Sequence, residues 1–301
     1  MKSACAFLFC LNLMATNKVV GQIVGRVFSG HEKGKQSERS QVHSSISVRA
    51  YDHLGQLIGE TFSDANGNYS LATPSGQTFR VEFGLLPTGY HAAPGSARIQ
   101  FTRSPATVNF KLLSSVQFTG SSPLTAVVSY RNGPVSIGDT VETVQRLDPS
   151  GKVAKQVNAS TPTGAVWGLA WERSTQRLFA AALAKRHADW GPLGAGGLYL
   201  AQGKTGALVP WFRLDDLGIV TAPKTLKRDF AEKMDQPSHD GAMLPWVGRC
   251  SLGGLDVAED GRTLYVMNLF DRTLYAVALS AGAKAPTRQH VTAIPVPDPR
   301  F

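Results

Sequence analysis

Strict alternation of apolar and polar residues is the feature that most constrains the fold of this 301-residue chain. It is clearest over residues 46–51 (ISVRAY) and 79–83 (FRVEF). A period of two residues places successive side chains on opposite faces of an extended strand, so each segment predicts a strand with one buried face. Five more strand-like segments occur, at 23–28, 57–62, 69–72, 97–101 and 108–112. Short strands separated by turn residues about every ten positions predict an all-β fold, with a β-sandwich over residues 23–113.

The segment SDANGNYSL, residues 63–71, has the alternating oxygen-bearing side chains of a calcium loop. An EF-hand loop needs glycine at its sixth position and glutamate at its twelfth, but counting from Asp64 these positions hold Tyr69 and Ser75. The Asn-Gly dipeptide inside the segment tolerates the positive φ angles of a tight turn. We therefore predict a hairpin here and no metal site.

Two later stretches, 166–200 and 252–277, share one pattern. Each contains Gly-Leu with an apolar strand, a turn, a strand with Leu and an aromatic residue, a second turn, and a Leu-Tyr strand. Such an internal repeat is typical of β-propeller blades. After a linker at 114–123, we therefore expect residues 124–301 to form an incomplete β-propeller-type region.

The number of blades limits this prediction. The copies are about 85 residues apart, roughly twice the length of one blade, so the spacing hides another blade or an insertion such as the Pro-rich, charged segment 214–247. A closed propeller needs at least four blades, and the sequence supplies two or three. Residues 290–296 would begin the next blade. We expect that the chain is truncated or that a second copy completes its sheet.

The N-terminus predicts export. Lys2 precedes the apolar run 4–15, which is too short for a membrane span and has the length of a signal-peptide core. Cleavage next to Gln22 gives a signal peptide of residues 1–22; the alternative is a short buried helix or strand. No other stretch is long and apolar enough for an integral membrane span. We expect a secreted or cell-surface protein.

Cysteine usage agrees with export followed by folding without an internal disulfide. Cys5 and Cys10 lie in the expected leader, which leaves Cys250 alone in the mature chain. A single thiol has no partner within the chain, so Cys250 is expected to be a small buried hydrophobic residue.

The charge balance is basic, with a formal net charge of +9 and a pI of about 9.6. Such a field favours anionic partners. Basic residues cluster only in the loops 33–39 and 224–228, and no zinc-knuckle or nucleic-acid-binding helix pattern accompanies them. We expect no nucleic-acid partner; the expected partner is an unidentified extracellular ligand or surface component, either glycan or protein.

Catalytic motifs are absent from the sequence. It contains no GxSxG, HExxH, P-loop or GxGxxG pattern. His/Asp clusters that could serve catalysis occur at His187–Asp189 and His239–Asp240. We predict no enzyme activity, no cofactor and no catalytic, cofactor-binding or metal-binding residue. One alternative is a propeller-type hydrolase or lactonase that uses these clusters as a base and its orienting partner.

A second alternative is a carbohydrate-binding protein. It depends on three tryptophans, which would be exposed on loops and strand ends, namely Trp190, Trp211 and Trp246. If they instead pack between blades, they indicate no ligand.

Five segments in order resemble an SdrD B-like (Cna B-type) domain of bacterial surface proteins over about ninety residues: 23–28, 48–52, 63–69, 79–83 and 87–90. The later segments LAKRHADWGPLGAGGLYL and LGGLDVAEDGRTLYVMNLFDRTLYAVAL resemble the propeller-like region that accompanies such domains in large bacterial exported proteins. The resemblance implies a prealbumin-like sandwich that acts as a stalk or spacer. It implies an exported, non-enzymatic surface or extracellular protein with a structural, adhesion or binding role.

Two family features do not carry over. Calcium-binding members hold the ion in an acidic loop after the first strand, whereas loop 30–39 has two carboxylates and three basic side chains. Other members form a Lys–Asn isopeptide bond near a buried acid, for which Asn109 and Glu82 are the counterparts. The opening strand supplies Arg26, which cannot act as the nucleophile, so Lys33 would have to reach in from the loop. We expect neither feature.

Overall fold

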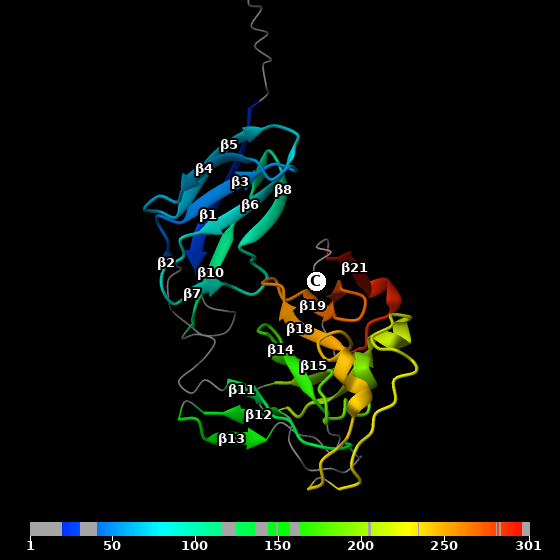
Figure 1. The fold of residues 1–301 in the computed structure, drawn as a ribbon. Coiled ribbons are helices and arrows are strands. Elements are labelled where there is room, and N and C mark those ends of the chain that lie inside the picture. The colour runs from blue at the N-terminus through cyan, green and yellow to red at the C-terminus, as the bar shows by residue number, and fades with distance from the viewer. Residues whose placement is uncertain are drawn as a thin grey trace, which may run out of the picture. The chain divides into compact units, whose positions relative to one another are not determined.

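The computed structural model describes residues 20–30, 41–115, 125–135, 144–148, 150–156, 163–203, 206–233, 235–280, 282 and 284–296 (Figure 1). The chain divides into two compact units, Met1–Leu86 with Arg98–Lys111, and Pro87–Ala97 with Leu112–Phe301. Strands and a few short 3-10 helices make up the regular structure of the described residues. The predicted all-β fold is confirmed.

Two sheets make up the sandwich at the front of the chain; most of their strands belong to the first unit, while β7 and the end of β10 are counted with the second. One has the order β4-β3-β6-β8, with bounds β3 (Ser47–Tyr51), β4 (Leu57–Phe62), β6 (Thr78–Gly84) and β8 (Ile99–Arg103). The other is built on β1 (Val20–Ser29), which pairs with β2 (Gln41–Val42), β5 (Asn68–Pro74) and β9 (Ala106–Thr107) and is followed in the sheet by β10 (Phe110–Ser114) and β7 (Tyr90–Ala92).

Aromatic contacts join the two sheets of the first unit. Phe83 of β6 stacks on Phe110 of β10 with 4.4 Å between ring centroids, and it meets Tyr69 of β5 edge-on at 5.8 Å. The alternation in β6 buries Phe79, Val81 and Phe83 on one face, as a period of two residues requires. The β-sandwich predicted for the front of the chain is confirmed.

The hairpin predicted at residues 63–71 is wrong. The turn exists, but β4 before it pairs with β3, whereas β5 after it pairs with β1 in the opposite sheet. Asp64 closes the turn, because its Oδ1 accepts the backbone N–H groups of Asn66 and Asn68, both at 2.8 Å. An Asn-Gly turn reverses the chain locally, but which strand then pairs with which is decided by packing of the two faces.

Gly67 in this turn has φ +74°, and a side chain there would collide with the carbonyl oxygen of Val27. Gly55 also has a positive φ, +79°, but no described atom lies within 4 Å of a Cβ placed there. Both Gly→Ala changes add the backbone strain of a left-handed residue, about 1 kcal/mol. We expect Gly67→Ala to cost about 1–3 kcal/mol more, because the crowding must also be relieved. Urea unfolding of the two variants measures the difference; equal losses would contradict the crowded turn.

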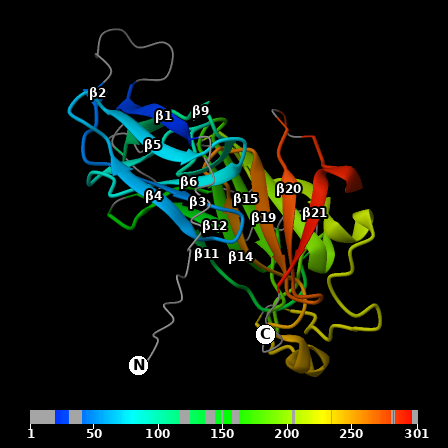
Figure 2. The same cartoon turned by 90° about the horizontal axis from the view of Figure 1, so that it is seen from above.

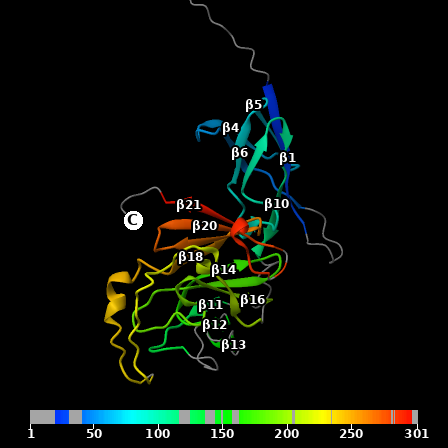
Figure 3. The same cartoon turned by 90° about the vertical axis from the view of Figure 1, so that its right-hand side faces the viewer.

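Three antiparallel sheets, each made of consecutive strands, form most of the second unit (Figures 2 and 3). The first is β11 (Thr125–Val128), β12 (Val144–Leu147) and β13 (Val153–Gln156). The second is β14 (Val166–Glu172), β15 (Arg177–Ala182), β16 (Gly197–Gln202) and β17 (Val209–Arg213). The third is β18 (Leu252–Val257), β19 (Thr263–Asn268), β20 (Thr273–Ala278) and β21 (Val291–Pro295). The short helices are η1 (Gly194–Gly196), η2 (Leu214–Leu217), η3 (Gly241–Trp246) and η4 (Arg288–His290).

Each copy of the sequence repeat forms one four-stranded sheet with the same strand order, but the described residues form no closed ring of sheets. One detail of the propeller prediction is wrong. Residues 290–296 do not begin a further blade, because β21 pairs with β20 from Thr273↔Pro295 to Val277↔Val291 and is the fourth strand of its own sheet.

The second and third sheets share one core. Phe179 and Leu198 of the second sheet belong to the same buried cluster as Leu264, Val266 and Val277 of the third. The first strands of the two sheets also approach closely: a Cβ on Gly168 in β14 would lie 2.6 Å from the carbonyl oxygen of Gly253 in β18. Glycine is needed where two backbones lie this near. The two sheets therefore pack as neighbours with β14 beside β18.

Candidate functional site

The two predicted His/Asp clusters lie next to each other in the second unit. The backbone N–H of His187 donates to Oδ2 of Asp240 at 2.9 Å, and Arg186 Nη2 donates to the carbonyl oxygen of His239 at 3.3 Å. The structure therefore brings together clusters that are about fifty residues apart in sequence, as the hydrolase alternative requires.

The carboxylate of Asp240 forms a buried ion pair with Arg228. Arg228 Nη2 lies 2.6 Å from Asp240 Oδ2, and the two side chains are 8% and 0% exposed. The guanidinium also lies over the rings of Trp190, at 4.8 Å, and Phe230, at 4.6 Å. Burial by itself raises the pKa of Asp240, but hydrogen bonds from Arg228 and from the His187 N–H outweigh it and hold that pKa below its usual value.

The carboxylate of Asp189 likewise accepts hydrogen bonds, in this case from backbone N–H groups. Its Oδ2 accepts the N–H of Val135 at 3.0 Å, and its Oδ1 accepts the N–H of Trp190 at 2.7 Å. Within the described part of the chain, neither Asp189 nor Asp240 bonds an imidazole nitrogen. A general base needs such an orienting bond or a reachable proton to abstract, so this cluster has the geometry of a structural clamp. We call it the Arg228–Asp240 clamp.

The three tryptophans predicted to be exposed are packed instead. Trp190 lies against Arg228, Trp211 contacts Phe179 and Phe212 at 5.2 and 4.7 Å, and Trp246 lies 6.0 Å from Phe270. All three are only partly exposed. The expectation that these three side chains form an exposed carbohydrate-binding platform is therefore wrong. The sequence does not show which other residues pack against a given side chain.

The tryptophans that do face solvent are Trp167 and Trp171, 59% and 40% exposed. Both lie on β14, four residues apart, on the face away from its buried residues. The positions between them, Gly168 and Ala170, are buried, but the run VWGLAW is apolar throughout and gives no sequence signal for which face is exposed.

Trp167 lines an open groove of about 430 Å³ that runs over the first strands of all three sheets. Its walls are apolar: Val127 comes from β11, Leu169 from β14 and Leu255 from β18. Among the residues that the structure describes, no ionisable side chain lines this groove.

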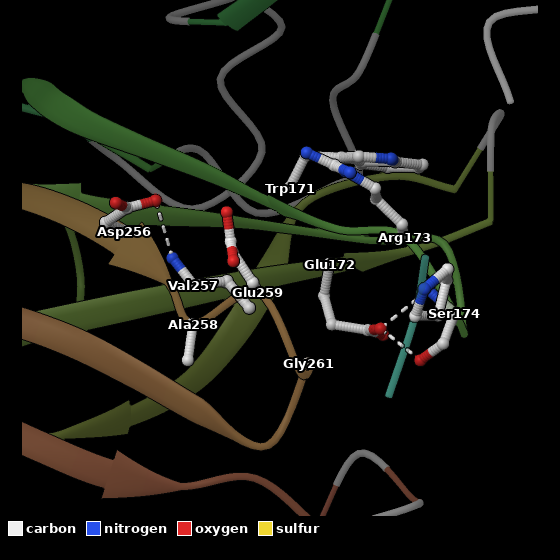
Figure 4. A pocket seen from close by; sticks show the side chains of 10 residues that line it. Trp171, Glu172, Arg173, Ser174, Asp256, Val257, Ala258, Glu259 and Gly261 are labelled. Carbon is white, nitrogen blue, oxygen red and sulfur yellow. Dashed lines mark hydrogen bonds between the residues drawn. The ribbon is translucent and has the colours of Figure 1, made fainter. Parts of the chain in front are cut away.

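A smaller polar cavity of about 270 Å³ contains Trp171 (Figure 4). The turn after β14 contributes Arg173, and the end of β18 with its following turn contributes Asp256 and Glu259. Pro94, from the segment of the second unit at Pro87–Ala97, completes the lining. We call this space the Trp171 cavity.

Glu172 also borders the Trp171 cavity, but its bonds are internal. Its carboxylate accepts the N–H groups of Ser174, at 2.6 Å, and Thr175, at 3.0 Å, together with both hydroxyls. It also pairs with Arg177 at 3.3 Å, and the two side chains are 0% and 5% exposed. Burial raises the pKa of Glu172, but the hydrogen bonds from Ser174 and Thr175 outweigh it, so that pKa is lowered. The carboxylate stays ionised and accepts the hydrogen bonds that hold the turn after β14.

Cys250 is buried beside Ala184 and Met243, and burial raises the pKa of its thiol to about 11. The thiolate is therefore scarce at neutral pH, and a nucleophilic role is disfavoured.

In the front unit, the described residues that family members use for a cross-link have local partners. Asn109 is exposed, and its Oδ1 accepts the backbone N–H of Arg26 at 3.0 Å, while Glu82 pairs with Arg80 at 2.8 Å. Lys33 lies outside the described residues, as do residues 1–19 of the expected signal peptide and most of the expected linker. Within the described ranges, no three His, Cys, Asp or Glu side chains are grouped to hold a metal ion. No helix in those ranges has the length and hydropathy to cross a membrane.

No family model matches the chain, and no curated protein matches it. Among solved structures it resembles the minor pilin GBS52 of Streptococcus agalactiae, at 9% identity and a TM-score of 0.25 over 31% of this chain and 45% of the pilin. It also resembles the shaft pilin spaA of Lactobacillus rhamnosus GG, at 10% identity and a TM-score of 0.27 over 64% of this chain and 97% of the pilin. The PQQ-bound aldose sugar dehydrogenase of Streptomyces coelicolor gives 14% identity and a TM-score of 0.31 over 78% of this chain and 74% of the enzyme. All three TM-scores lie below 0.5, so the comparisons assign neither a family nor an activity.

Proposed function

We propose that the chain is an exported, non-enzymatic surface or extracellular protein with a structural, adhesion or binding role. In this proposal residues 1–22 are a signal peptide, and 23–113 form an SdrD B-like (Cna B-type) sandwich that acts as a spacer. Residues 114–123 are a linker, and 124–301 form an incomplete propeller-type region that carries the binding surfaces. Two adjacent four-stranded sheets with their first strands side by side support the propeller part.

One observation carries the non-enzymatic part of the proposal. The hydrolase alternative needs the carboxylates of Asp189 and Asp240. Asp189 instead accepts hydrogen bonds from two backbone N–H groups, and Asp240 forms an ion pair with Arg228. By contrast, the two exposed tryptophans of β14 each line an open groove or cavity. Exposed aromatic side chains beside a hollow are typical of binding surfaces.

Turnover assays separate the proposal from the hydrolase alternative. The purified full chain is incubated with p-nitrophenyl acetate and with dihydrocoumarin, an aryl ester and a lactone. We expect rates equal to those in buffer for the native chain and for His187→Ala and His239→Ala. Saturable turnover that either substitution abolishes, at unchanged melting temperature, would establish the hydrolase instead.

A further inference from the structure

We propose that the first unit associates with a second copy of this chain through the free edge of β8, with the two β8 strands antiparallel about a two-fold axis beside Phe101. The two copies then share one continuous sheet. The inference goes beyond the proposed function and does not use it. It depends on the direction of the backbone groups of β8, on the exposure and charge of its side chains, and on their spacing.

The backbone groups of β8 point alternately toward β6 and away from the sheet. β8 is the last strand of the sheet β4-β3-β6-β8, and in the described part of the chain it pairs with β6 alone (Figure 1). The N–H of Phe83 donates to the carbonyl oxygen of Arg98, and the N–H of Ser104 donates to that of Gln77, both at 2.9 Å. Hydrogen-bonded pairs alternate with non-bonded pairs along an antiparallel ladder. The even-numbered residues of this stretch therefore bond to β6.

The odd-numbered residues Ile99, Phe101 and Arg103 consequently turn their N–H and C=O groups out of the sheet edge. Among the residues that the structure describes, no strand lies beside this edge to accept or donate hydrogen bonds there. Such a row of unpaired backbone groups is a template for one further strand.

The side chains of the same residues add an apolar surface next to this edge. Side chains two residues apart lie on one face of a strand, and on this face Ile99 is 50% and Phe101 is 72% exposed. Arg103 follows on the same face, and its Nε donates to the carbonyl oxygen of Gly76 at 2.9 Å. A partner strand at this edge would therefore cover apolar side chains as well as pair the backbone.

Other edge strands of the chain carry features that oppose such pairing. β17 and β21 are the last strands of their sheets and contain Pro210 and Pro295, which have no N–H to donate. β4, at the opposite edge of the same sheet, pairs with β3 through a register shift between Ala50 and Tyr51. Such an irregularity twists an edge away from a flat partner. β8 contains no proline and pairs with β6 in one unbroken register.

The spacing along β8 identifies a second copy as the partner. With the two-fold axis beside Phe101, this residue faces Phe101 of the second copy, and Ile99 faces Arg103 of the second copy. Outward-pointing groups then meet outward-pointing groups at every position, and each facing pair exchanges two N–H···O bonds. Phe101 also gains an aromatic cross-strand neighbour. An interface of this kind is self-complementary, as a two-fold dimer requires.

The charges near β8 do not oppose this pairing. Arg103 is the one ionisable side chain of β8. In the proposed register the two copies of Arg103 are four positions apart along the strands, about 13 Å, which exceeds the Debye length of about 8 Å at physiological salt. On the neighbouring strand β6, Arg80 pairs with Glu82 at 2.8 Å and lies 4.6 Å from the ring centroid of Tyr51. The apolar pair at the centre therefore brings no like charges together.

The small size of the interface sets its strength. A single added strand pair buries less than the roughly 1,200 Å² at the lower end of stable complexes. We therefore expect a reversible dimer whose population rises with protein concentration.

Sedimentation velocity of the full chain over about a hundredfold range of concentration measures the association. Phe101→Lys should weaken dimerisation about tenfold or more, because it places two like charges opposite each other at the centre of the interface. Phe62→Lys is the matched control, since Phe62 is 51% exposed and lies on β4 at the opposite edge of the same sheet. This control should dimerise as the native chain does. Far-UV circular dichroism and the melting temperature check that both variants keep the fold.

Cysteine cross-linking tests the register. In Phe101→Cys the two thiols face each other across a hydrogen-bonded pair, with about 5.5 Å between Cα atoms, so mild oxidation should give a covalent dimer that reductant reverses. Ile99→Cys should not cross-link with itself, because its two copies are about 13 Å apart along the strands. A mixture of Ile99→Cys and Arg103→Cys should cross-link. The native chain, in which Cys250 is buried, gives the background.

Three results would each overturn the inference. The native chain could stay monomeric at every concentration. Phe101→Lys could dimerise as the native chain does, or Phe62→Lys could lose as much association, which would indicate pairing of β8 with β4 of the next copy. Ile99→Cys could cross-link with itself as readily as Phe101→Cys. The cross-linking result decides the question even if Phe101→Lys does not fold.

Discussion

Replacing Arg228 by methionine is expected to lower the free energy of unfolding of the second unit by about 3–5 kcal/mol. The substitution keeps an apolar stem against Trp190 and Phe230 but leaves Asp240, which is fully buried, without its cation. It also removes the donors to the carbonyl oxygens of Lys185 and Ala188. Removing one partner of a buried ion pair lowers the free energy of unfolding far more than removing one partner of an exposed pair does.

Urea unfolding followed by tryptophan fluorescence measures this loss. All five tryptophans of the chain lie in the second unit, so the signal reports that unit. The matched control is Arg213→Met, because Arg213 also pairs with an aspartate at 2.6 Å, but the two side chains are 48% and 55% exposed. Exposed pairs contribute little, so the control midpoint should barely move. Equal shifts in the two variants would contradict the clamp.

The clamp also predicts a pH dependence. The pKa of Asp240 is lowered in the folded chain, so the stability it contributes is present above the unfolded-state pKa of about 3.9 and is lost as pH falls through the folded value. In Arg228→Met, burial acts on Asp240 without the cation, and its pKa should rise. The gap between native chain and variant should therefore be widest at neutral pH and should narrow in acid.

Glu172→Ala is expected to cost about 3–5 kcal/mol, the second large effect. The change removes the acceptor of two backbone N–H groups and two hydroxyls in the turn after β14. It also leaves the buried guanidinium of Arg177 with only the carbonyl oxygens of Ser280 and Gly282. Asp216→Ala, at an exposed pair in the same unit, is the control and should change the same fluorescence transition little. A loss for Glu172→Ala no larger than that of the control would mean that the turn does not depend on this carboxylate.

The local conformation of the chain could be predicted from sequence, whereas its strand partners could not. Alternation over residues 46–51 and 79–83 correctly predicts β3 and β6, because a period of two residues follows from strand geometry. The same pattern does not say which strand lies beside which. For that reason the hairpin predicted at 63–71 and the separate blade predicted at 290–296 are both wrong. Strands do flank the turn at 63–71, and a strand does lie within 290–296, but their pairing partners differ from the predicted ones.

The candidate site shows the same limit. The clusters around His187 and His239 are visible in the sequence, and they meet in space. Their role depends on Arg228, which reaches Asp240 from an irregular loop whose path no periodicity encodes. The exposure of Trp167 and Trp171 could not have been predicted from sequence, because the run VWGLAW is apolar throughout and charged Glu172 lies on the buried face of β14.

Export is the central claim, and the N-terminus of the protein made by its source organism tests it most directly. Cells are separated into cytosolic, surface and extracellular fractions, and the N-terminal peptide of the chain is identified in each by mass spectrometry. The account predicts a chain in the surface or extracellular fraction that has lost its leader and begins next to Gln22. A chain that retains Met1 and stays in the cytosolic fraction would contradict it.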